Sequence, residues 1–97
     1  MQTDENEEVV KRFFKAIYAL KDCGVIRGKQ TFTNRYGINR WNLNTLEKEP
    51  HRSLLKISWL SYLVTDYGIS GDWLLTGRGD MFSKHQKVAR YGNVLSC

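Results

Sequence analysis

Glycines that follow helical stretches divide this chain into short helices. Apolar side chains recur at three- and four-residue intervals before Gly24 and Gly68, and Gly37 and Gly77 follow shorter helical stretches. Glycine readily adopts the left-handed backbone conformation that ends a helix. No segment alternates convincingly between apolar and polar residues with the period of a strand. We therefore predict an all-α fold, a compact bundle of five or six helices.

The expected helices are bounded by capping residues and by the single proline. Thr3 or Asp4 can cap the first helix, Asn39 the third and Ser70 the fifth. Pro50 ends the third helix, because helical geometry is disfavoured at the residue before a proline. The five expected helices run from residue 3 or 4 to about 23, and over residues 29–36, 40–49, 51–67 and 71–75.

Length and charge indicate one small domain with a polyanionic partner. The 97 residues suffice for one domain, expected over residues 1–82 and followed by a basic tail or short extra helix over residues 83–97. The formal net charge is +5, although four acidic residues lie among the first eight. The rest of the chain is therefore strongly basic, which favours nucleic acid as a partner. A merely solvated basic surface is the alternative that charge leaves open.

The chain lacks the features of a secreted protein, a membrane protein or an enzyme. Its N-terminus is polar and acidic, and no apolar run approaches the ~20 residues that a membrane span needs. We expect Cys23 and Cys97 to be reduced thiols, and His51 and His85 lack metal-ligand spacing. No nucleophile motif or phosphate-binding loop is present. We expect a cytoplasmic protein, bacterial or phage-encoded, without metal, cofactor or catalytic residues.

Residues 28–50, GKQTFTNRYGINRWNLNTLEKEP, carry the most informative pattern. A short helix, a glycine turn, a capping asparagine and a second short helix are the parts of a helix-turn-helix, which presents its second helix to the major groove of DNA. Helical spacing puts Leu43 and Leu46 on the core side, together with Ile38. Arginine suits the paired acceptors of guanine, and asparagine suits the edge of adenine. The side expected to face outward carries Arg40, Trp41, Asn44, Thr45 and Lys48.

Two stretches resemble the Cro and lambda-repressor family, also called the xenobiotic-response-element type. YGIN at residues 36–39 is similar to the family's leucine-glycine-isoleucine-serine turn, and Leu43, Leu46 and Glu47 occupy the places of its isoleucine, isoleucine and glutamate. SGDWLLTGRG at residues 70–79 is similar to the ending of many short phage-repressor domains. The two matches occur in the same order as in the family, and together they cover most of residues 9–82.

The resemblance implies five helices around one core, with DNA contacts at the starts of the second and third. By position, it puts Arg40, Trp41 and Asn44 where the family reads bases, and Thr45 shares their expected side. It puts Lys29, Thr31 and Lys48 near where the family contacts phosphate. The chain departs from the family pattern at three positions of the second helix, where serine, glutamine and alanine are usual: Gly28, Lys29 and Thr33.

The sequence thus predicts a sequence-specific DNA-binding transcriptional regulator, most simply a repressor, that inserts residues 40–49 into the major groove. Because so small a domain touches few base pairs, we expect a homodimer on double-stranded DNA. Two alternatives stay open: an antitoxin-like autorepressor or recombination accessory DNA-binding protein, and a helical protein-interaction adaptor without DNA binding. The dimer surface is expected to come from Leu75, Met81, Phe82, Tyr91 and Leu95.

Overall fold

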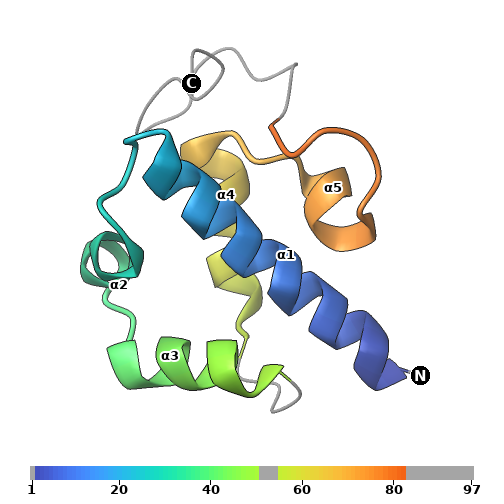
Figure 1. The fold of residues 1–97 in the computed structure, drawn as a ribbon, viewed down its shortest axis with the longest axis horizontal. Coiled ribbons are helices and arrows are strands. Elements are labelled where there is room, and N and C mark those ends of the chain that lie inside the picture. Colours follow the sequence, from blue (N-terminus) through green and yellow to red (C-terminus); the bar gives the residue numbers. More distant parts are fainter. Residues whose placement is uncertain (1, 51–54, 83–97) are drawn as a thin grey trace. The chain divides into compact units, whose positions relative to one another are not determined.

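The computed structural model describes residues 2–50 and 55–82, and these form five helices and no strand (Figure 1). An isolated antiparallel bridge joins Ile69 and Phe82. The predicted all-α fold with five helices is confirmed, while the expected sixth helix lies outside the described residues. The helices are α1 (Gln2–Asp22), α2 (Lys29–Tyr36), α3 (Arg40–Lys48), α4 (Ile57–Tyr67) and α5 (Gly71–Thr76).

The helices fall into two compact units, one ending at Leu55 and one beginning at Lys56. The first unit holds α1, α2 and α3, and the second holds α4 and α5. The domain boundary expected at residue 82 stays a prediction. The features that position the candidate site all belong to the first unit.

Aromatic rings join α1 to α2 within the first unit. The ring of Phe13 meets that of Phe32 nearly edge-on, with centroids 5.8 Å apart, and Phe32 lies 5.1 Å from Tyr36. Phe13 and Phe32 are completely buried. Large rings in edge-to-face contact stabilise a core beyond the area they bury. The apolar side chains expected at three- and four-residue intervals before Gly24 form a buried stripe on α1: Val10, Phe13, Phe14, Ile17 and Leu20.

A three-residue turn connects α2 to α3 and sets the start of α3. Gly37 has the left-handed conformation (φ 64°), and its N–H donates to the carbonyl of Thr33. Asn39 caps α3, because its side-chain oxygen accepts from the N–H groups of Trp41 at 2.8 Å and Asn42 at 3.2 Å. In Figure 1, α2 is seen nearly end-on and α3 from the side, so their axes cross at a large angle. Both predicted caps are confirmed.

The helix α4 begins later than its apolar pattern predicts. Residues 51–54 lie outside the described residues, but Leu55 and Lys56 are not helical, so the expected helix over residues 51–67 is wrong there. Lys56 has an extended backbone and gives α4 no side-chain cap. An apolar pattern indicates which side of a helix is buried, but it does not indicate where the helix begins. The start depends on the local backbone conformation and on the capping residue. The cap of α5 is as predicted, with Ser70 accepting from the N–H of Trp73.

Cys23 lies just beyond α1 and is disulfide-bonded. Cys97 lies outside the described residues. The expectation of a reduced thiol is therefore wrong for Cys23. A disulfide depends on the distance between two residues in the fold, which sequence spacing alone does not indicate.

Candidate nucleic-acid interface

The helix α3 separates an exposed polar face from a buried apolar face. Leu43 and Leu46 are almost fully buried, while the indole of Trp41 is 64% exposed. Asn39 fixes the first turn of α3, because its side-chain oxygen accepts hydrogen bonds from the N–H groups of Trp41 and Asn42. The expected separation of faces is confirmed for the four residues that lie exposed: Arg40, Trp41, Asn44 and Lys48.

Thr45 does not belong to the exposed face. Its side chain is only 9% exposed, so the expectation that it faces outward and contacts a base is wrong. Around the helix, Thr45 comes between the exposed Trp41 and the half-buried Asn42. A residue at this border is buried or exposed according to what packs beside it. Spacing along α3 alone does not decide such a position.

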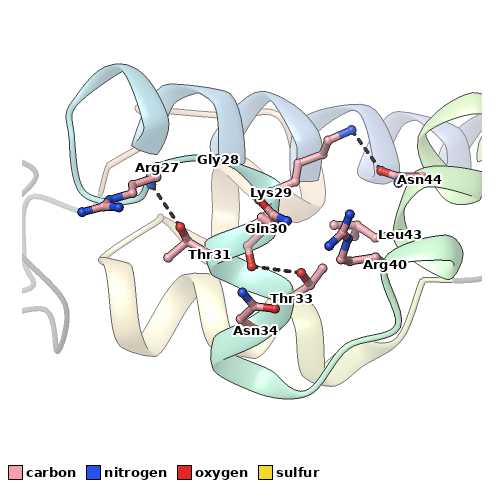
Figure 2. A pocket seen from close by; sticks show the side chains of 10 residues that line it. All are labelled: Arg27, Gly28, Lys29, Gln30, Thr31, Thr33, Asn34, Arg40, Leu43 and Asn44. Atoms are coloured by element: carbon pink, nitrogen blue, oxygen red, sulfur yellow. Dashed lines mark hydrogen bonds between the residues drawn. The ribbon is translucent and has the colours of Figure 1, made fainter.

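The start of α2 and the start of α3 border one hollow, with a volume of about 630 Å³. Figure 2 shows side chains from both helices around it. Lys29 and Thr31, expected near phosphate, both line this hollow. The Thr31 hydroxyl also accepts from the backbone N–H of Arg27 at 3.2 Å. The lining residues are Arg27, Gly28, Lys29, Gln30, Thr31, Thr33, Asn34, Arg40, Leu43 and Asn44.

A carboxylate on α3 ties the three helices of the first unit together. Glu47 accepts from the Lys29 ammonium through Oε1 and from the Tyr18 hydroxyl through Oε2, each at 2.5 Å. Lys29 also donates to Oδ1 of Asn44 at 3.2 Å. We call Tyr18, Lys29 and Glu47 the Glu47 clamp. It joins α1, α2 and α3 and brings Lys29 against a residue of the exposed face.

The clamp shifts the pKa values of its members. Burial by itself would raise the pKa of Glu47, but hydrogen bonds from Lys29 and Tyr18, with the Lys29 charge, lower it overall. The hydrogen bond to Glu47 raises the pKa of Lys29 and also raises that of Tyr18. The clamp therefore combines a carboxylate, an ammonium and a neutral phenol over a wide pH range. Its charges are half-buried, so solvent screens them in part.

The clamp could not be recognised in the sequence. Glu47 stands out there only as a family-like position, and no pattern singles out Tyr18. Their partners come from three different helices, so no local spacing links them. One signal was present: Asn44 and Glu47 are three residues apart on α3 and therefore lie on neighbouring sides of it.

In residues 2–50 and 55–82, no group of three or more histidine, cysteine, aspartate or glutamate side chains could hold a metal ion. His51 and His85 lie outside these ranges. No helix within the same ranges is long and apolar enough to cross a membrane. No family model, curated protein or solved structure matches the chain.

Proposed function

We propose that this protein binds double-stranded DNA sequence-specifically and regulates transcription, most simply as a repressor of the phage-repressor type. In this proposal α2, the turn at Gly37 and α3 act as a helix-turn-helix, and α3 enters the major groove. The observation that carries the proposal is the exposed face of α3. It projects Arg40, Trp41, Asn44 and Lys48 from a helix whose opposite face is anchored by buried leucines.

The side chains on this face have the chemistry that base reading needs. A guanidinium and an amide form hydrogen bonds with base edges, and an indole offers an apolar surface that suits the thymine methyl. Lys48 supplies a charge for phosphate. The indole of Trp41, 64% exposed, is available to a partner. An α-helix fits the width of the major groove.

The hollow beside α3 supports contacts with the DNA backbone. Arg27 and Arg40 bring positive charge to it, together with Lys29. The start of α2 opens into it with Gly28 as a cap that makes no side-chain hydrogen bond. Backbone N–H groups at a helix start and nearby basic side chains both favour phosphate. We therefore assign the α2 side of the hollow to the DNA backbone, and the exposed face of α3, with Arg40 and Asn44 at the edge of the hollow, to the bases.

Specificity on a genome requires more base pairs than one α3 can read. We propose a homodimer that places two copies of α3 in successive major grooves, about 34 Å apart, on a palindromic site. Among the residues named for its interface, Leu75 is exposed, while Met81 and Phe82 are half-buried. Tyr91 and Leu95 lie outside the described residues. Sedimentation of the protein with and without its DNA site tests the stoichiometry of two chains per duplex.

The test of the proposed function is fluorescence anisotropy on DNA fragments across a salt series. The fragment upstream of the protein's own gene is compared with random DNA of the same length. We expect tighter binding to the first fragment and affinity that falls steeply as salt rises, because phosphate contacts release counterions. Salt-insensitive association with a protein, and no shift of any DNA fragment, would instead identify a protein-interaction adaptor.

A further inference from the structure

Lys29 links the Glu47 clamp to a residue of the exposed face. Its ammonium donates to Oε1 of Glu47 at 2.5 Å and to Oδ1 of Asn44 at 3.2 Å. Figure 2 shows Lys29 reaching from the start of α2 toward Asn44 on α3. The Lys29 side chain is 29% exposed, so it is held in place and still borders solvent. A residue expected to contact only phosphate therefore contacts a residue expected to read bases.

The chemistry of lysine fixes the orientation of the Asn44 amide. An ammonium group has three N–H donors and no acceptor, so it can face only the oxygen of an amide. The Asn44 oxygen is consequently turned toward Lys29. Because Asn44 is exposed, its amide nitrogen is the end that a partner meets, and this end carries two N–H donors.

An asparagine held in this way is less suited to adenine than a free one, because Lys29 already occupies one of the two lone pairs of its oxygen. Recognition of adenine uses both ends of the amide, since the oxygen accepts from N6 and the nitrogen donates to N7. Guanine instead presents two acceptors, N7 and O6. The orientation of the Asn44 amide therefore favours guanine.

We propose that Lys29 is a positioning residue that turns Asn44 into a hydrogen-bond donor, so that the pair selects guanine over adenine at the base it meets. This inference rests on the proposed DNA binding and adds the identity of one base. Glu47 contributes by anchoring the Lys29 ammonium, and Tyr18 by occupying the other Glu47 oxygen. The common preference of asparagine for adenine is thereby reversed.

The test compares base preference in the full chain and in matched variants. The selected DNA site is varied to all four base pairs at each position, and binding is measured by anisotropy at low salt. Asn44→Ala identifies the position that Asn44 reads, since preference disappears there. We expect the unmodified chain to prefer guanine over adenine at that position by about tenfold. Lys29→Met keeps the apolar stem and should abolish or reverse the preference, whereas Lys29→Arg keeps a donor-only group and should retain it.

Lys48→Met is the matched control, because it makes the same substitution at a different lysine, which lies on α3. It should weaken binding to all sites and leave the base preference unchanged. The proposal is overturned if the unmodified chain prefers adenine, if no position depends on Asn44, or if Lys29→Met retains the guanine preference. Sequence-specific binding survives each of these results. If the unmodified chain shows no preference for any DNA sequence, the proposed function is overturned as well.

A measurement on the unmodified chain covers the case in which Lys29→Met fails to fold. In the DNA-free protein, nuclear Overhauser effects should connect the ε-methylene protons of Lys29 to the side-chain protons of Asn44. Their observation supports the contact between Lys29 and Asn44 from which the orientation of the amide follows. Their absence from a folded, assigned protein overturns it.

Discussion

The two faces of α3 are made by the same nine residues and have opposite physical tasks. Leu43 and Leu46 on one face are buried and hold the helix in place, whereas Arg40 and Trp41 on the other reach solvent. Substitutions on the first face should change the free energy of unfolding. Substitutions on the second should change binding alone. The comparison teaches that a short helix can read a partner only if its other side is fixed independently.

The largest expected effect is on the buried face. Leu46→Ala should lower the free energy of unfolding by about 2–5 kcal/mol, because it leaves a cavity at a fully buried site. Urea unfolding followed by circular dichroism measures the change. At a temperature where the variant is folded, its relative affinities for different DNA sites should match those of the unmodified chain. A stable Leu46→Ala protein with altered base preference would break the separation of the two faces.

On the exposed face, Arg40→Ala should reduce the discrimination between the specific site and random DNA by about 1–3 kcal/mol. Its free energy of unfolding should stay within about 0.5 kcal/mol, because the removed side chain is exposed. Lys48→Ala is the control: it should weaken binding to all DNA alike and reduce the salt slope by about one. Equal losses on specific and random DNA for Arg40→Ala contradict its assignment to bases.

Asn39 caps the start of α3, and its substitution should destabilise the helix that carries both faces. Asn39→Ala removes the oxygen that accepts two backbone N–H groups, which should cost about 1 kcal/mol of unfolding free energy. Thermal unfolding by circular dichroism is the measurement. Asn34→Ala serves as control, since Asn34 is an exposed asparagine within α2 rather than a cap. We expect a far smaller change in that variant, and equal destabilisation would show that the cap adds nothing.

The smallest effect concerns the Glu47 clamp and depends on pH. Glu47→Gln should lower the free energy of unfolding at neutral pH by about 1 kcal/mol or less, as expected for half-exposed ion pairs. The folded-state pKa of Glu47 lies below its ordinary value of 4.5, so its contribution is present above that pH and lost as pH falls through the lowered value. The raised pKa values of Tyr18 and Lys29 give the opposite pH dependence, because their contribution to stability is lost as pH rises.

Those two groups therefore set the alkaline limit of the clamp. Their contribution is complete below their ordinary values of 10.0 and 10.5 and is lost as pH rises through the raised values. Unfolding measured from pH 3 to pH 11 should show the difference between the unmodified chain and Glu47→Gln only inside this window. A difference that persists unchanged at pH 3 would contradict the role of the ionised carboxylate.

The sequence predicted the features that local backbone chemistry decides. Gly37 and Asn39 mark the end of α2 and the start of α3 because each acts on N–H groups within a few residues of itself. Ser70 marks the start of α5 for the same reason. The face of α3 followed from helical spacing, because Leu43 and Leu46 are both apolar and close in angle.

The features that the sequence did not predict depend on contacts between distant residues. Thr45 lies at the border of two faces, and only packing decides its burial. The Glu47 clamp joins residues from three helices, and the orientation of the Asn44 amide follows from it. The helix α4 begins later than the sequence predicts, since apolar residues continue on both sides of its start. Local patterns carry no information about such long-range contacts.

The uneven exposure of the tryptophans gives the protein an intrinsic optical probe. The indole of Trp41 is 64% exposed, whereas those of Trp59 and Trp73 are 4% and 8% exposed. A dissolved quencher such as iodide should therefore reach the indole of Trp41 but not those of Trp59 and Trp73. Whatever covers the outward side of α3 should shield the indole of Trp41 and shift its emission to shorter wavelength. Occupancy of this surface can thus be followed without attaching a dye.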